Sequence, residues 1–314
     1  MTRAERLRRA LAGDDSAGVL FSIWFHFGTQ HLPAHRTAAI HVDFFEAYDL
    51  DWLKVMSDYR YPMPPGVTEV ETVEALRRFT RFSMEAPELA EQLRCLREIG
   101  ARLGADVPFI ETVFSPLGVA RRTLRSHMMP LWESHPTAFK NFLESVTETL
   151  QSYVKAVAET GAAGIFYSIN GIGEDEMSES QFEEWVMPYD LAVMETAAEL
   201  ARAGKFYFNV AHLHGTRLRW KPVFEHYPAH AFNWSVHHSP PTLEEARAAT
   251  RAALIVGIDE VGLTGRAPSE VRRMVRETIA RVGRSGLIIG PGCAVPTDTP
   301  ADLIVAAREA CREP

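Results

Sequence analysis

Cysteine is scarce in this sequence, and it has neither a long apolar run nor an excess of basic charge. The three cysteines among 314 residues, Cys95, Cys293 and Cys311, lack the spacing of a disulfide framework, so we expect a cytoplasmic protein. No stretch reaches the roughly 18–20 apolar residues of a membrane span, and the charged first residues contain no apolar signal core. The formal net charge of -8 disfavours nucleic acid and anionic membranes as partners.

A glycine-rich fingerprint is also missing after the first predicted strand, which disfavours an open dinucleotide-binding sheet. The sequence instead alternates short apolar runs with helical patterns of 3.6-residue period. We predict strands over residues 19–27, 52–56, 108–114, 164–169, 206–212, 231–236, 254–259 and 286–290. We predict helices over residues 75–100, 138–160, 180–203, 242–253, 269–282 and 301–312. This alternation predicts an α/β fold, a (β/α)8 TIM barrel, as a single domain over residues 1–314 with an N-terminal helical extension.

Two histidines end the fifth predicted strand, and a cysteine follows the eighth. His212 and His214 are two residues apart in an extended segment, so their side chains point to the same side. Cys293 follows Gly290-Pro291-Gly292 about eighty residues later. Two imidazoles and a thiolate suit zinc, and three protein ligands with an open fourth position are typical of a catalytic zinc site. We therefore predict that His212, His214 and Cys293 bind zinc; strand-end histidines and a buried free cysteine are the alternative.

Polar residues also gather at the other predicted strand ends, where TIM barrels carry their chemistry. We predict catalytic roles for Asp58 and Tyr167, although Asp58 can instead cap a loop and Tyr167 can instead pack. We predict substrate contacts for a further set: His26, Glu111, Ser168, Asn170, Trp234 and His237. Glu111 lies inside a predicted strand, where an unpaired charge is costly, so it either meets a basic partner or faces the site.

Several short motifs in this order resemble the uroporphyrinogen decarboxylase superfamily, a (β/α)8-barrel superfamily. The resemblance covers nearly the whole chain and rests on the following segments: Trp24-Phe25-His26-Phe27, the run from Asp51 to Asp58, Val113-Phe114-Ser115-Pro116-Leu117, the run from Gly161 to Phe166, His212-Leu213-His214-Gly215 and Gly290-Pro291-Gly292-Cys293. The sequence is more similar to the zinc-dependent methyltransferase branch, which acts on methyl-corrinoid proteins. His212 and Cys293 match ligands of that branch, whereas His214 stands where it usually has cysteine. Imidazole in place of thiolate makes the site less electron-rich and a stronger Lewis acid.

The resemblance implies a methyltransferase-like enzyme with zinc, a small-molecule substrate, a methyl-corrinoid donor on a separate partner protein, and a homodimer by analogy. The runner-up is a metal-free decarboxylase-like lyase acting on a carboxylated substrate. Asp58 matches the essential carboxylate of that branch, but its arginine-rich run after the first strand is missing, and Pro291 stands where it has histidine. A non-catalytic barrel that binds a ligand is the third reading.

Overall fold

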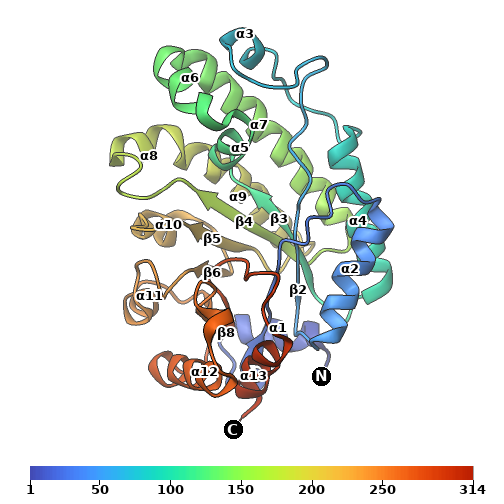
Figure 1. The fold of residues 1–314 in the computed structure, drawn as a ribbon, viewed down its shortest axis with the longest axis vertical. Coiled ribbons are helices and arrows are strands. Elements are labelled where there is room, and N and C mark those ends of the chain that lie inside the picture. Colours follow the sequence, from blue (N-terminus) through green and yellow to red (C-terminus); the bar gives the residue numbers. More distant parts are fainter. Residues whose placement is uncertain (314) are drawn as a thin grey trace.

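The computed structural model describes residues 1–313 and shows eight parallel strands in one curled sheet surrounded by helices (Figure 1). The strands are β1 (Leu20–Phe21), β2 (Leu53–Val55), β3 (Phe109–Phe114), β4 (Gly164–Asn170), β5 (Val210–His214), β6 (Ala231–Trp234), β7 (Ala253–Ile258) and β8 (Leu287–Pro291). Their order in the sheet is β1-β8-β7-β6-β5-β4-β3-β2. Sequential neighbours in a parallel sheet are what a TIM barrel requires, so the fold is a (β/α)8 barrel as predicted.

The two strands at the ends of this order, β1 and β2, meet through a short seam. The backbone N–H of Asp51 donates to the carbonyl of Phe21 at 3.0 Å, and the Ser22 hydroxyl donates to the carbonyl of Trp52 at 2.8 Å. The carboxylate of Asp51 accepts a further hydrogen bond from the backbone N–H of Phe21 at 2.8 Å. These contacts join β1 and β2, which have no ladder pairing with each other.

Helices precede, separate and follow the strands along the chain. They are α1 (Arg3–Leu11), α2 (Ala34–Ala47), α3 (Val73–Leu76), α4 (Pro87–Leu103), α5 (Pro116–Leu124), α6 (Met128–Ser134), α7 (Pro136–Val157), α8 (Glu179–Trp185), α9 (Met187–Arg202), α10 (Trp220–His226), α11 (Leu243–Ala249), α12 (Pro268–Val282) and α13 (Ala301–Arg312). Helix α1 is the predicted N-terminal extension. It starts at a capping box of Thr2 and Glu5, and its Leu7 and Ala10 join the apolar interior of the barrel. No helix among residues 1–313 is both long and apolar enough to span a membrane.

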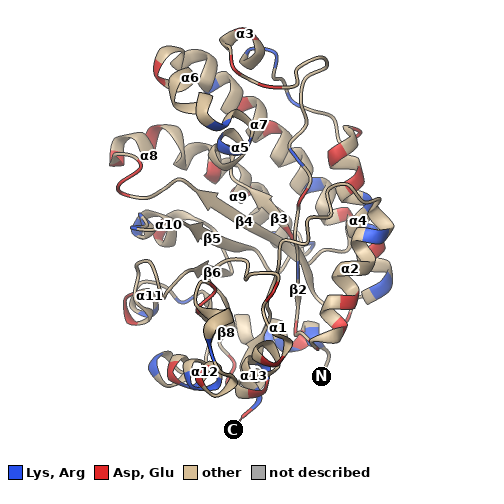
Figure 2. Cartoon of the chain, in the orientation of Figure 1, with Lys and Arg blue, Asp and Glu red and all other residues tan. Residues whose placement is uncertain are grey.

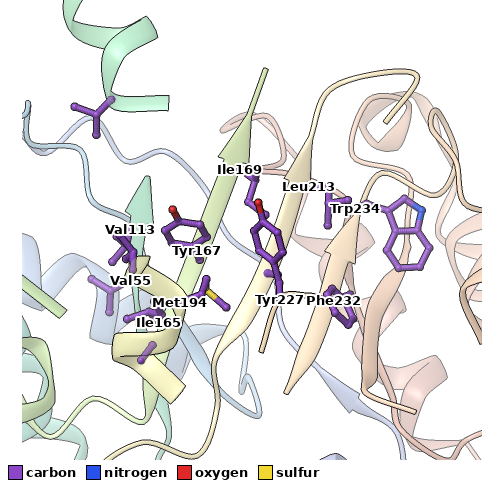
Figure 3. Packing of buried hydrophobic residues seen from close by; sticks show 14 of the residues in the cluster. Val55, Val113, Ile165, Tyr167, Ile169, Met194, Leu213, Tyr227, Phe232 and Trp234 are labelled. Carbon is purple, nitrogen blue, oxygen red and sulfur yellow. The ribbon is translucent and has the colours of Figure 1, made fainter. Parts of the chain in front are cut away.

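Side chains of each strand alternate between two apolar clusters, and this alternation decides which residues can reach the site. The inner cluster fills the barrel and includes Ile110. It also contains four aromatic residues whose rings meet in edge and tilted contacts: Trp24, Trp52, Phe166 and Phe208. The outer cluster lies between the strands and the helices (Figure 3). Two adjacent residues of a strand therefore belong to different clusters, one inside the barrel and one between the strands and the helices.

All eight predicted strands are present, but several helices differ from the prediction. The helix predicted over residues 75–100 is wrong as a single element, because α3 ends at Leu76 and α4 begins at Pro87. Proline has no N–H and disfavours a helical residue before it, so it starts a helix well and interrupts one badly. The helix predicted over residues 180–203 is likewise divided at Val186, between α8 and α9. The sequence interpretation also missed α2, α5, α6 and α10.

Candidate metal centre

The carboxyl ends of β5 and β8 bring two histidines and a cysteine together. His212 and His214 project from the same face of β5, and Cys293 lies just after β8. Each of the three offers a ligand atom within 4.8 Å of the other two, and the Cys293 Sγ lies 3.5 Å from His214 Nδ1. Strands β6 and β7 separate β5 from β8 in the sheet, so the three side chains meet only because the sheet curls into a barrel.

The surroundings favour the protonation states in which these three side chains bind metals. Burial lowers the pKa of both His212 and His214, so both imidazoles are neutral near pH 7. Burial alone raises the pKa of Cys293, but the neighbouring His212 and the charge of Lys54 lower it below its ordinary value. Neutral imidazole and thiolate are the forms that coordinate a metal ion.

One nitrogen of this cluster lacks a partner within the protein. His212 is 3% exposed, and its Nδ1 has no hydrogen-bond partner among the described residues. A buried polar atom without a partner costs free energy, and a metal ion bound to this nitrogen would remove that cost. Two imidazoles and one thiolate are a donor set that zinc accepts with an open fourth position. Within residues 1–313, no other group of three or more His, Cys, Asp or Glu side chains converges in this way.

A buried carboxylate holds the turn that carries Cys293. Glu260 follows β7, is 7% exposed, and accepts the backbone N–H of Gly292 at 3.1 Å. A Cβ atom on Gly292 would lie 2.3 Å from the Cα of Ser235 and 2.7 Å from the Glu260 carboxylate, so only glycine fits here. The negative charges of Glu176 and, to a smaller extent, Glu260 also oppose the effect of burial on the pKa of His214. Glu260 thus positions the cysteine turn and adds negative charge near the centre.

A lysine lies inside the barrel near the same three residues. Lys54, on β2, is 3% exposed, and its Nζ lies 4.4 Å from the centre of the Phe166 ring. The Phe166 ring in turn lies 5.0 Å from the His212 ring. Burial lowers the pKa of Lys54 to about 8, and the charge of Cys293 opposes this effect. The sequence interpretation missed Lys54, whose signal is a single charge inside the apolar run 52–56.

Asp58 and His26 form a pair at the strand ends of β1 and β2. The Nδ1 of His26 lies 3.0 Å from one Asp58 oxygen, and the other oxygen accepts the backbone N–H groups of Gly28 and Thr29 at 3.0 and 3.4 Å. Burial raises the pKa of Asp58, but these hydrogen bonds and the charge of His26 lower it below its ordinary value. Asp58 is therefore a charged group that orients an exposed imidazole.

Two predicted substrate contacts lie beside the histidines. Ser168 and Asn170 on β4 pair in register with His212 and His214 on β5, so they share the inner face. The Asn170 amide donates to the Ser168 hydroxyl at 3.1 Å. The predicted contact His237 lies after β6, where its Nε2 is 3.3 Å from the carbonyl of Gly257.

Three predicted site residues lie on the outer face instead. Tyr167 donates its hydroxyl to Asp190 of α9 at 2.8 Å, in the layer that also contains Tyr227 and Met194 (Figure 3). Trp234 packs in the same layer, and its indole N–H donates to the carbonyl of Pro241. This placement corrects the prediction of a catalytic Tyr167 and a substrate-binding Trp234. Their immediate neighbours on the strands, Ser168 and Asn233, face inward.

Glu111 is the third residue whose predicted role is corrected. It is fully buried on the outer face of β3, where it accepts hydrogen bonds from Gln92 of α4 and Tyr153 of α7. Burial raises its pKa to about 8, whereas the hydrogen bonds and the charge of Lys54 act in the opposite direction. Glu111 therefore joins β3 to two helices through neutral partners. The sequence predicted that it would either pair with a basic residue or face the site, and it forms a hydrogen bond with neither.

Comparison with known proteins bears on the fold and on the family. The structure superposes on a methyltransferase from Methanosarcina mazei with a TM-score of 0.79 and 16% identity, covering 99% of this chain and 98% of the other. It also superposes on a B12-independent methionine synthase from Shewanella sp. W3-18-1, solved in complex with selenomethionine, with a TM-score of 0.58 and 12% identity over 89% and 87% of the two chains. At these identities the similarity shows the shared barrel fold. No curated protein sequence matches the chain.

The sequence itself matches one family model. The model for uroporphyrinogen decarboxylase (URO-D) matches residues 53–314, which is most of the chain and includes β2 to β8 with His212, His214 and Cys293. The resemblance inferred from the motifs is therefore confirmed. This chain belongs to the uroporphyrinogen decarboxylase (URO-D) family.

Proposed function

We propose that this protein is a zinc-dependent methyltransferase of the URO-D family that methylates a small thiol or a similar soft nucleophile. The observation that carries the proposal is the convergence of His212, His214 and Cys293 at the carboxyl ends of β5 and β8. The similarity in fold to a protein described as a methyltransferase supports the same reading. The methyl donor in this proposal is a methyl-corrinoid carried by a separate partner protein.

The residues of this chain would divide the work as follows. His212, His214 and Cys293 would hold zinc through three ligands and leave a fourth position for the substrate thiol. When bound, zinc lowers the pKa of such a thiol so that it is deprotonated near neutral pH. Ser168 and Asn170 lie beside the two histidines and would orient the substrate. In the overall reaction a sulfur–methyl bond forms, the bond between methyl and donor breaks, and the thiol proton is released.

His26 and Asp58 would handle that proton. Asp58 holds the Nδ1 side of the His26 ring, and the exposed ring leaves Nε2 free to accept a proton. The ionised Asp58 stabilises the imidazolium that results. This assignment keeps Asp58 in the catalytic role predicted from the sequence and gives His26 a proton-accepting role in place of simple substrate contact.

Metal analysis of the full chain purified without a histidine tag tests the proposal directly. We expect about one zinc per chain in the wild type and a sharp loss in Cys293→Ser and His214→Ala. Cys311→Ala is the matched control, because Cys311 lies on α13 and donates to the carbonyl of Ala307. A folded and active wild-type enzyme without bound metal would contradict the proposal.

A decarboxylase-like lyase remains the second candidate, because the matching family model carries that description and Asp58 is held ionised at the strand ends. This candidate makes the opposite prediction for two variants. Turnover of a carboxylated substrate would survive in Cys293→Ser and be lost in Asp58→Asn. A methyltransferase loses activity with Cys293→Ser.

A further inference from the structure

A cavity of about 500 Å³ lies beside the strand ends and apart from the metal centre. It is bounded by residues 57–71 after β2, the end of β3, and helices α4, α5 and α7, whose arrangement Figure 1 shows. This volume is within the range of about 300–1,000 Å³ that small-molecule sites occupy. None of the three converging ligand residues lines the cavity, but Ser57 and Tyr59, on either side of Asp58, do.

The body of the cavity is apolar and aromatic. Met63, Val70, Leu89 and Leu124 line it, together with the rings of Tyr61 and Phe114. Val70, Leu89 and Leu124 are buried in the outer core, and Tyr61, Met63 and Phe114 are partly buried against that core. Such a lining favours a ligand with an apolar, preferably planar, body.

Three arginines also line this cavity, and none of them forms an ion pair within the part of the chain that the structure describes. They are Arg60, Arg122 and Arg125. Arg122, on α5, holds its guanidinium 4.1 Å from the centre of the Phe114 ring (Figure 2 shows the basic residues of α5). Its neighbour Arg121, in contrast, pairs with Glu176 at 2.8 Å. A planar guanidinium fixed over a ring but without a carboxylate partner is well placed to bind one from a ligand.

The acidic residues of the lining limit the charge of the ligand. Glu69, Glu71 and Glu88 line the cavity as well. Glu71 lies 3.9 Å from the Nε2 of His127, and Glu88 lies in the first turn of α4, where the helix dipole favours negative charge. The negative charges of these three glutamates make a dianionic phosphate group a less favourable ligand than a monoanionic carboxylate.

We propose that this cavity is a binding site for a small aromatic carboxylate, with the carboxylate on Arg122 and the ring against Phe114 and the apolar lining. The site adjoins Asp58 through Ser57 and Tyr59, so its ligand lies next to the mouth of the barrel. The proposal goes beyond the methyltransferase function and does not depend on a bound metal. An experiment that refutes binding in this cavity therefore leaves the methyltransferase proposal untouched, and the reverse also holds.

Isothermal titration calorimetry on the full chain tests this site with 3-phenylpropionate and benzoate and with their neutral amides as probes. The titrations are made in the presence of a chelator, so that metal binding does not contribute. We expect at least one carboxylate to bind about tenfold or more tightly than its amide, since a charged hydrogen-bonded pair is worth more than a neutral contact. Arg122→Met should remove this preference and leave amide binding unchanged, whereas Arg122→Lys should retain part of it.

Arg97→Met is the matched control, because Arg97 is an exposed arginine of α4 that does not line the cavity. Met63→Trp fills part of the cavity and should weaken the acid and the amide alike. Circular dichroism and thermal unfolding establish that each variant is folded. Equal affinity for acids and amides in the wild type, no binding of any of the four probes, or a preference that survives Arg122→Met would each overturn the proposal.

Discussion

Replacing Glu111 by glutamine is expected to stabilise this protein, and increasingly so as the pH rises from 5 to 7. Glu111 is fully buried and accepts hydrogen bonds from Gln92 at 2.9 and 3.1 Å and from Tyr153 at 2.8 Å. Burial is the largest influence on its pKa and raises it from 4.5 to about 8. The folded protein therefore keeps a proton that the unfolded chain loses.

The size of the effect follows from this difference in pKa. Below about pH 4.5 both states are protonated, and Glu111 contributes no pH dependence. Between about pH 4.5 and 8 only the unfolded chain ionises, so stability falls by up to about 1.4 kcal/mol per pH unit and then levels off. Between pH 5 and 7 the wild type should lose about 2–3 kcal/mol through this residue. Glutamine does not ionise, and its amide N–H can donate to the Gln92 Oε1, which has no partner among residues 1–313.

Urea unfolding of the wild type and Glu111→Gln at pH 5, 6 and 7 measures this difference. The free energy of unfolding of the variant, relative to the wild type, should rise by about 2–3 kcal/mol across the range. Glu98→Gln, at an exposed position of the same helix that carries Gln92, should show a difference that does not change with pH. A difference between Glu111→Gln and the wild type that stays constant with pH would refute the view that Glu111 is buried in its neutral form.

Three further predictions concern the strand ends. Asp58→Ala removes the hydrogen bonds to His26 and to two backbone N–H groups, and urea unfolding should show a loss of about 2–4 kcal/mol. Glu260→Gln should weaken zinc binding about tenfold in competition with a chelator, because it removes a buried charge beside the cysteine turn. Glu184→Gln, which removes a charge from an exposed ion pair with Lys140, should change zinc binding little. Gly292→Ala should lower zinc affinity further than Glu260→Gln, since the added Cβ forces the turn away from Ser235; unchanged affinity would show that this turn does not set the ligand position.

The amino-acid pattern alone determined the class of fold and the three residues that converge. Eight apolar runs separated by helical periodicity are enough to specify a parallel barrel, because buried strands and amphipathic helices differ in their repeat. The positions of His212, His214 and Cys293 follow from the same reasoning, since the carboxyl ends of all barrel strands meet at one face. The apolar periodicity does not fix where each helix begins. Helix α4, for example, begins at Pro87, inside a segment predicted as one continuous helix.

Only the tertiary structure decided which face each strand residue occupies. Tyr167, Trp234 and Glu111 are polar or aromatic strand residues, yet they point outward and form hydrogen bonds with the surrounding helices and loops. Lys54 is charged and lies within an apolar run, yet it points inward toward the centre. Adjacent strand residues face opposite sides, so a shift of one position moves a side chain from the site to the outer core. The sequence shows that side chains alternate between two faces. Which residues face inward is decided by packing between elements that are far apart in the chain.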